Sequence, residues 1–263
     1  ISVNINDIDE KPIITSGSTF TANENQTAIG SITATDESSD LIYELGGTDA
    51  GSISINNLDG TMTFNSAPDY EIKSSYSLIA YVSDDNFTSR KAIQVLINNL
   101  NDNNPSITSS ASFTVDENET VIGTVTATDA DNDTLTYSIS GSEIAIDSSS
   151  GVLTFVEAPD YETKSSYSAT VTVSDGTNSD TQDITVAINA LNDNTPSITS
   201  SASFTADENQ TTIGTLTATD ADGDTITFSI SGTEINIDSS SGVLTFVEAP
   251  DYETKSSYSA TVT

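Results

Sequence analysis

Apolar and polar positions alternate with a period of two along most of this chain. The clearest runs lie at 167–173, 184–188 and 226–230, and clusters of Gly, Ser, Asn and Asp such as 147–151 separate the runs. A period of two predicts strands with one buried face, and the Thr, Val, Ile and Tyr residues that fill the runs favour the same structure. The chain is therefore expected to be all-β.

The pattern occurs in three copies, with Pro12, Pro105 and Pro196 at equivalent points. Residues 102–172 and 193–263 align over 71 positions, and because ten of these differ, 61 are identical. Each copy holds about seven strands, which at this length predicts an antiparallel β-sandwich. The predicted parts are the last strand and linker of an upstream repeat (1–11), two repeats with their linkers (12–103 and 104–194), and a repeat that stops before its last strands (195–263).

Acidic residues dominate the charge: 40 Asp and Glu face six Lys and Arg, and the formal net charge is -34. Nucleic acid and anionic membranes would repel such a chain, so neither is expected as a partner. No apolar run is long enough for membrane insertion. The chain has no Cys and no His, which excludes thiol and imidazole catalysis and leaves oxygen ligands, the kind that suit Ca²⁺.

Four acidic signatures recur at the ends of the predicted strands. A Glu follows the first strand, Asp-Ala-Asp follows a later one, Pro-Asp-Tyr-Glu precedes a long strand, and Val-Ser-Asp ends that strand. A sandwich gathers its loops at two poles, and an extended backbone would point both acids of Asp-Ala-Asp or Asp-Tyr-Glu the same way. Carboxylates this close repel one another unless a cation neutralises them. The signatures therefore indicate metal sites.

These elements in this order resemble the cadherin repeat over the whole chain: the Glu in DEN, then ATDAD, IDSSSGVLT, PDYE, ATVTVSD and NDN before Pro. The resemblance implies tandem seven-stranded Greek-key sandwiches of immunoglobulin-like architecture in a linear array. It also implies about three Ca²⁺ ions at each complete junction, held by one repeat, the linker and the next repeat. The Cys-free, Ser/Thr/Asp-rich composition is more typical of a large bacterial surface adhesin than of an animal cadherin.

The resemblance also assigns the ligands residue by residue. At the first complete junction the implied metal ligands are Glu24, Asp69, Glu71, Leu100 (through its carbonyl), Asn101, Asp102, Asn103, Asp129, Asp131 and Asp175. At the second they are Glu117, Asp160, Glu162, Leu191, Asn192, Asp193, Asn194, Asp220 and Asp222.

The chain departs from the family pattern in two places. Asn99 and Ala190 stand where the family's linker begins with Asp, and we expect them to alter support around the ions more than direct ligation. At the upstream face of the first repeat, Ser38 replaces the second Asp of Asp-Ala-Asp and the linker at 7–12 is shorter. Fewer ions are expected at that upstream junction.

Two other uses of these carboxylates were weighed. Asp220, Asp222 and Asp224 could open an EF-hand loop, but Thr225 stands at its Gly position and Ser231 at its terminal Glu position. Paired carboxylates also serve glycosidases, but here the pairs recur in every repeat and the chain has no Trp to stack a sugar. We therefore do not expect an enzyme.

The sequence predicts a Ca²⁺-rigidified extender of an extracellular or cell-surface adhesin that supports cell adhesion. Its first partners are the neighbouring repeats of the same chain, and cell-surface proteins or glycans are the candidate external partners. The alternative is a calcium-dependent homophilic or glycan-binding adhesive module. Near-identity between two copies favours a spacer, because length is then the useful property.

Overall fold

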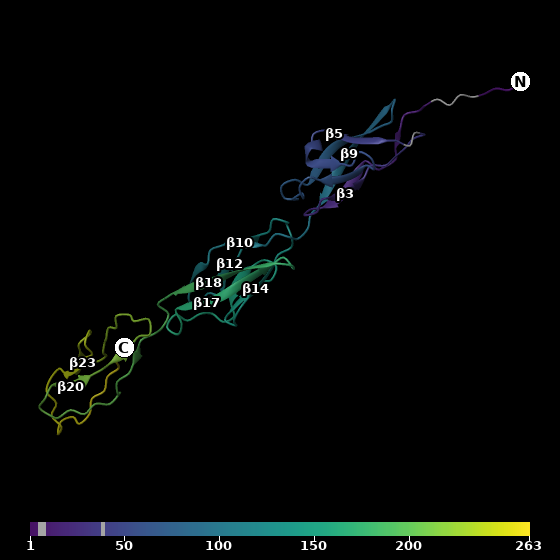
Figure 1. Ribbon diagram of the computed structural model, residues 1–263. Coiled ribbons are helices and arrows are strands. Elements are labelled where there is room, and N and C mark those ends of the chain that lie inside the picture. Colours follow the sequence, from purple (N-terminus) through teal and green to yellow (C-terminus); the bar gives the residue numbers. More distant parts are fainter. Residues whose placement is uncertain (5–8, 38–39) are drawn as a thin grey trace. The chain divides into compact units, whose positions relative to one another are not determined.

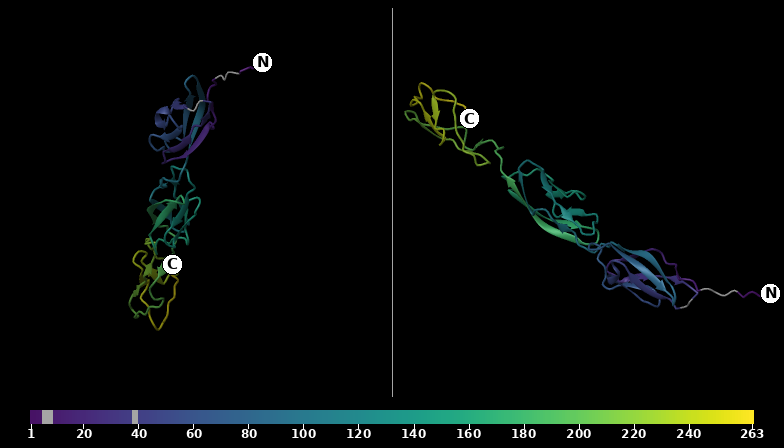
Figure 2. Two further views of the ribbon diagram at one scale, coloured as in Figure 1. Left: turned by 45° about the vertical axis from the view of Figure 1, so that its right-hand side comes forward. Right: turned by 90° about the horizontal axis from the view of Figure 1, so that it is seen from above.

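The computed structural model in Figure 1 describes residues 1–4, 9–37 and 40–263. Part of the predicted upstream linker at 7–12, and Ser38, lie outside the described residues. The chain divides into two compact units, one formed by 1–108 with 127–136 and 173–180, the other by 109–126, 137–172 and 181–263. Figures 1 and 2 show strands and loops throughout, and the described residues form no α-helix.

The first unit contains the first sandwich and the loops that follow its linker. Its elements are β1 (Ile13–Ile14), β2 (Thr19–Asn23), β3 (Ala28–Ser31), β4 (Ala34–Thr35), β5 (Ile42–Gly46), the 3₁₀ helix η1 (Ala50–Ser52), β6 (Ile53–Ile55), β7 (Thr61–Phe64), β8 (Ser75–Ser83), β9 (Thr88–Asn98), β10 (Ser106–Ile107) and β13 (Ala127–Thr128). The main sheet has the order β2-β9-β8-β5, the second sheet has the order β3-β7-β6, and short pairs β1-β4 and β10-β13 complete the unit.

The core of this sandwich follows from the alternation. In β8 the side chains of Tyr76, Leu78, Ala80 and Val82 are buried, and the residues between them are more exposed. Successive side chains of a strand point to opposite faces. The period of two therefore places the apolar side chains on one face of each sheet, and these two faces form the core.

The second unit repeats this arrangement. The strands that lie wholly or mainly in it are β11 (Ser112–Asp116), β12 (Val121–Thr124), β14 (Thr136–Ile139), β15 (Ile144–Ile146), β16 (Val152–Phe155), β17 (Ser166–Ser174), β18 (Ser179–Asn189), β19 (Ser197–Ile198), β20 (Thr212–Thr215), β21 (Ala218–Thr219), β22 (Ile235–Ile237) and β23 (Val243–Phe246). The sheets have the orders β11-β18-β17-β14, β12-β16-β15 and β20-β23-β22. The predicted all-β class of tandem β-sandwiches is confirmed, and the predicted domain boundaries stay a prediction.

The pairing is not antiparallel throughout. Strand β2 runs parallel to β9 over five residue pairs, and β11 runs parallel to β18 in the same way. The reason lies in the first strand of each repeat, which breaks into two pieces: β1 pairs with β4, and after residues 15–18 the chain continues as β2 beside the last strand. Alternation predicts the strands but not this change of partner.

Residues 226–230 correct a second expectation, because their alternation predicts a strand and only Ile230 is assigned, in a bridge with Val262. In the second repeat the corresponding β14 pairs with β17, which β18 supports on its other side. In the third repeat no described residue takes the place of β18. An apolar hollow lined by Phe204, Leu244 and Phe246 therefore remains, and we interpret it as a gap in the sheet, not a ligand pocket.

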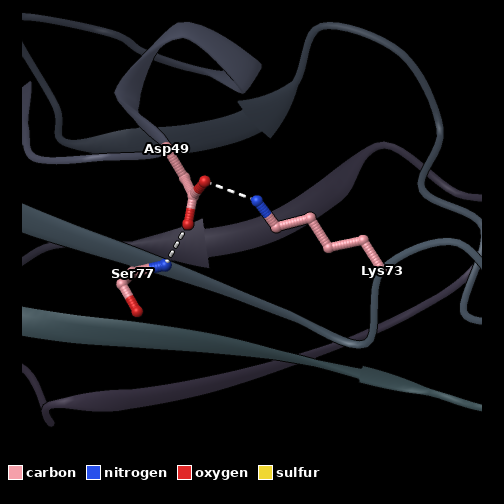
Figure 3. A network of polar contacts seen from close by, with 3 residues as sticks. All are labelled: Asp49, Lys73 and Ser77. Carbon is pink, nitrogen blue, oxygen red and sulfur yellow. Dashed lines mark hydrogen bonds and ion pairs between the residues drawn. The ribbon is translucent and has the colours of Figure 1, made fainter.

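Few basic side chains are available to form ion pairs with the acids, since six Lys and Arg face 40 Asp and Glu. In the first repeat, Lys73 pairs with Asp49, whose other oxygen accepts the Ser77 N–H at 2.7 Å (Figure 3). These bonds hold the pKa of the Asp49 carboxyl below its usual value. The lysine lies over the Tyr76 ring, 4.6 Å from its centroid. Lys164 and Lys255 make matching pairs with Glu143 and Glu234 in the later repeats.

Candidate metal centres

A buried glutamate stands at the end of β2 and of β11. Glu24 is 1% exposed, and its two carboxylate oxygens accept the N–H groups of Tyr70 at 2.8 Å and Leu100 at 2.6 Å. Glu117 repeats this with Tyr161 and Leu191 at the same two distances. Hydrogen bonds to an ionised group are stronger than those between neutral groups. Glu24 therefore fixes the start of the first linker to the loop before β8, and Glu117 fixes the start of the second linker to the loop before β17.

Asp131 holds the other end of the first linker. It is 5% exposed, and its carboxylate accepts the backbone N–H groups of Asp102 at 3.1 Å and Asn103 at 2.9 Å, together with the Asn103 side chain at 3.0 Å. Burial alone would raise the pKa of Asp131, but these hydrogen bonds outweigh it and lower the pKa. The linker is thus held by a carboxylate at each end.

These contacts bring together acids of the first sandwich, of the linker and of the repeat that follows, all within the first unit. Carboxylate oxygens of Glu24, Glu71, Asp102 and Asp131 all lie within 4.8 Å of one another. Burial, with the charges of Glu24 and Asp131, raises the pKa of Glu71. Repulsion of this kind is relieved when a cation binds.

The second unit contains the same arrangement around its own linker. Oxygens of Glu117, Glu162 and Asp193 lie within 4.8 Å of one another. Asp222 accepts the N–H groups of Asp193 at 3.1 Å and Asn194 at 2.8 Å, and bonds from the Asn194 side chain and these N–H groups lower its pKa. Burial, with the charges of Glu117 and Asp222, raises the pKa of Glu162.

A further acidic group lies in the loop after β13, where oxygens of Asp129, Asp131 and Asp133 lie within 4.8 Å of one another. Asp133 is not among the ligands predicted from the sequence. The backbone bends at 130–131, where an extended segment was assumed from Asp-Ala-Asp, and Asn132 next to it has φ 61°. The corresponding loop of the third repeat brings together Asp220, Asp222 and Asp224.

Some buried carboxylate oxygens in the first unit have no partner. The Oδ2 atoms of Asp129, Asp133 and Asp175 are buried and accept no hydrogen bond within the described part of the chain. Asp175 uses its other oxygen to accept the N–H groups of Thr177 and Asn178, both at 2.6 Å. Buried anionic oxygens without donors are costly, and hard oxygen ligands of this kind fit Ca²⁺.

Three predicted acidic ligands, Asp69, Asp160 and Asp175, lie outside these groups. Asp69 and Asp160 accept bonds within their own turns, from Ile72 at 3.0 Å and Thr163 at 3.1 Å respectively, and neither joins the acidic group beside it in the described residues. A fifth acidic group, in the last repeat, does include the acid that corresponds to Asp69 and Asp160. It consists of Glu208, Asp251 and Glu253.

The linker asparagines contact the acids and the loops of the next repeat. The side chain of Asn101 donates to the main-chain oxygen of Asp175 at 3.4 Å, and that of Asn192 donates to Asp224. Leu100 and Leu191 donate their N–H groups to the glutamates, whereas ligation through their carbonyl oxygens stays a prediction.

Asn99, one of the departures from the family pattern, donates to the main-chain oxygen of Asp131 at 2.8 Å. It therefore supports the loop that carries a candidate ligand, and its amide lies against the main chain. The expectation of fewer ions at the upstream junction stays a prediction, since Ser38 is not described.

Two asparagines at these centres were missed. Asn25 and Asn118 have φ of 61° and 68°, and their side chains donate to Asp102 and Asp193. The signal was the Asn that follows Glu in both copies, since Asn tolerates the left-handed region better than most residues.

Comparison with known proteins identifies the type of repeat. Residues 111–191 match the family model of the cadherin domain. Human protocadherin Fat 1 is 31% identical over 277 residues, covering 92% of this chain and 6% of that protein. Mouse cadherin EGF LAG seven-pass G-type receptor 2 is 31% identical over 198 residues, covering 67% of this chain and 7% of the relative.

Solved structures show the same fold. Mouse cadherin-23 EC22-24 superposes with a TM-score of 0.73 at 23% identity, covering 97% of this chain and 93% of that one. Protocadherin gamma B2 extracellular cadherin domains 1-5 give a TM-score of 0.72 at 22% identity, over 98% of this chain and 57% of that one. These are tandem extracellular β-sandwich modules.

The chain consists of tandem cadherin-like repeats, an extracellular or cell-surface module of the kind found in cell adhesion proteins. The relatives named here are adhesion proteins and receptors, not enzymes. The chain spans less than a tenth of the length of these curated relatives. No helix in its described residues is long and apolar enough to cross a membrane. A bacterial source stays a prediction.

Proposed function

We propose that these repeats bind Ca²⁺ at their junctions and form a calcium-rigidified extender of a cell-surface adhesin. One observation carries the proposal: Glu24 and Glu71 precede the linker, Asp102 belongs to it and Asp131 follows it, yet their oxygens lie within 4.8 Å of one another. A cation bound there contacts segments on both sides of the linker and the linker itself.

The ligands we propose are those assigned from the resemblance, about three ions per complete junction. At the first junction they are Glu24, Asp69, Glu71, Leu100, Asn101, Asp102, Asn103, Asp129, Asp131 and Asp175. At the second they are Glu117, Asp160, Glu162, Leu191, Asn192, Asp193, Asn194, Asp220 and Asp222. Bound calcium would neutralise the negative charge of these carboxylates.

The acidic residues of the first junction have different roles. Glu24 and Asp131 hold the linker through its backbone N–H groups. Burial raises the pKa of Glu71, and the charges of Glu24 and Asp131 raise it further. Without calcium, repulsion therefore strains a linker that the hydrogen bonds restrain, and calcium converts that repulsion into attraction. We infer a mechanical, non-catalytic role.

Calcium titration by calorimetry, combined with small-angle scattering of the whole chain, tests this proposal. We expect several ions to bind, and chelation to broaden the scattering-derived distribution of lengths and increase protease cleavage at 100–105 and 191–196, while circular dichroism shows the strands intact. Identical scattering profiles with and without calcium would contradict stiffening. Calcium-dependent association of chains would favour the homophilic adhesive module instead.

A matched pair of variants localises the effect. Asp131→Asn removes charge from the first acidic group but keeps an oxygen that can accept the Asp102 and Asn103 bonds, whereas Asp183→Asn makes the same change on an exposed residue within β18. Only the first should lower calcium binding and restore cleavage at 100–105 in the presence of calcium.

A further inference from the structure

The outer face of the main sheet in the first repeat carries apolar side chains on three adjoining strands, β5, β8 and β9. Ile79 and Tyr81 alternate with the buried residues of β8, so they point away from the core, and both are half-buried. Ile42 of β5 is 40% exposed, and Ala92 of β9, which pairs with Ile79, is also exposed. The fold does not require apolar residues here, because one face of an antiparallel sheet can be solvated.

The second repeat has polar side chains at the matching positions. Strands β17 and β18 have the same lengths as β8 and β9 and follow them at a constant offset in the sequence. The residues that match Ile79, Tyr81 and Ala92 are Thr170, Thr172 and Asp183. The same sheet therefore forms without the apolar side chains. Since aromatic residues and Arg are enriched at protein interfaces, their presence on this face of one repeat indicates binding.

Tyr81 is held in a fixed position on this face. A Cβ added at Gly46 would lie 2.9 Å from Cε2 and 3.7 Å from the hydroxyl oxygen of Tyr81, so the ring lies over this glycine. The side chain remains only half-buried, which leaves part of the ring accessible. A ring that is already held loses little conformational freedom when a partner binds, and anchoring side chains of this kind dominate interfaces.

One acid and one base flank Tyr81 across the sheet. Glu44 of β5 and Arg90 of β9 both pair with Tyr81, one on each side, and both are exposed. Neither forms an ion pair within the described residues. The other outward positions of β5, β8 and β9 are uncharged, so this face has no net charge in a chain of formal charge -34. Two copies can approach each other here with the least repulsion.

We propose that two copies of the chain associate through this face, each through the outer side of β5, β8 and β9 in its first repeat. A two-fold axis that lies between the faces and runs along β8 places Glu44 of one copy opposite Arg90 of the other, and does so twice, because such an interface uses the same surface on both copies. The two Tyr81 rings then meet at the axis. The charges on this face are therefore self-complementary.

The size of the face sets the strength of this contact. Three strands about 4.8 Å apart, with residues about 3.3 Å apart along nine positions of β8, span roughly 14 Å by 30 Å. Stable interfaces bury about 800 Å² on each partner, so this face lies at the low end. We expect a weak, reversible dimer and no permanent one. The face contains none of the proposed calcium ligands, so the inference goes beyond the proposed function and does not depend on it.

Sedimentation equilibrium of the whole chain tests the proposal at concentrations up to about 1 mM, where weak complexes become populated. The wild type should dimerise reversibly, both in calcium and in chelator. A variant with Ile79→Thr and Tyr81→Thr should dimerise at least about tenfold more weakly, because a few anchoring residues carry most of the binding energy. The second repeat has threonine at both positions, so the variant should fold, and circular dichroism checks this.

Two charge reversals test the two-fold arrangement itself. Glu44→Arg and Arg90→Glu each place like charges opposite one another, so neither variant should self-associate. An equimolar mixture of the two places opposite charges at both contacts and should form a mixed dimer. Asp183→Arg, on the matching face of the second repeat, is the control and should dimerise like the wild type. Net repulsion cannot explain a loss in Glu44→Arg, because this variant is less negative than the wild type.

Each result supports or overturns the proposal. A wild type that stays monomeric in both conditions overturns it. Association that persists in all variants, or two reversed variants that do not associate when mixed, places the contact on another surface and overturns it too. Calcium binding is a separate question: if the wild type dimerises but binds no calcium, this inference stands and the proposed function falls.

Discussion

Glu117 accepts two backbone N–H groups while it is 2% exposed, so its removal leaves two donors without partners. Glu117→Ala should lower the free energy of unfolding by about 2–4 kcal/mol, since each buried unsatisfied donor costs about 1–3 kcal/mol. Urea unfolding in chelator measures this apart from calcium. Glu119→Ala, on an exposed side chain two residues away, should change stability by less than about 0.5 kcal/mol. Equal effects would contradict the role of Glu117.

Asp49 gives a pH-dependent prediction. Its pKa is lowered by the bonds from Lys73 and Ser77, so its contribution to stability is present above the unfolded-state pKa and is lost as pH falls through the folded-state pKa. Asp49→Asn should therefore cost about 1 kcal/mol near neutral pH, and the difference from wild type should vanish in acid.

Denaturant unfolding across pH checks this difference. Glu143→Gln is the control, because its partner Lys164 and Glu143 itself keep 42% and 55% of their side-chain surface exposed, and exposed pairs contribute little. A constant Asp49→Asn effect at every pH would contradict the assignment.

The sequence predicted the acids but not all their roles. Spacing identifies Glu24, Asp131 and Asp222, because strand ends deliver side chains to a pole of the sandwich. It could not separate Asp69, which accepts a bond within its own turn, from Glu71, which joins the acidic group. That distinction depends on side-chain direction within one loop. Asp133 was not predicted because the spacing Asp-x-Asp-x-Asp was considered only at 220–224, as the opening of an EF-hand.

At the scale of elements, the turn between β15 and β16 depends on one glycine. Gly151 has φ 71°, and a Cβ there would stand 2.3 Å from the main-chain oxygen of Val125, whereas Gly141, with φ 85°, has open space around it. Gly151→Ala should destabilise by more than about 2 kcal/mol through strain and the clash, and Gly141→Ala by about 1 kcal/mol through strain alone. Thermal unfolding of the two variants compares them, and equal losses would show that the close contact relaxes freely.

Alternation in the sequence predicts β8, β9, β17 and β18 well, because one face of each is buried. It does not predict the breaks after β1 and β10, where the chain changes pairing partner, because a strand of two residues is too short to show an alternation. Nor does it predict which runs stay paired: 226–230 has the pattern, but not the neighbouring strands that would hold it. Pairing is a long-range property that no local window contains.

At the scale of the whole molecule, a net charge of -34 opposes compaction. In chelator, raising NaCl from 0.1 to 1 M shortens the screening length from about 10 Å to about 3 Å, and the melting temperature should rise by about 5 °C, equivalent to roughly 1 kcal/mol for a domain of this size. With saturating calcium the rise should be smaller, because bound ions already offset the acids. Calorimetric scans at several salt concentrations measure how the melting temperature changes with NaCl in chelator and in calcium. A salt-independent melting temperature in chelator would contradict the expected effect of charge repulsion.

The parallel pairing of β2 with β9 also has a mechanical consequence. Tension on a repeat enters through the chain before β2 and leaves through the chain after β9, and two parallel strands pulled in this way slide along each other. The five residue pairs between Thr19–Asn23 and Gln94–Asn98 would then bear the load together, whereas a hairpin pulled at its open end separates one pair at a time. The first two sandwiches therefore resist stretching through the parallel strands beside their linkers.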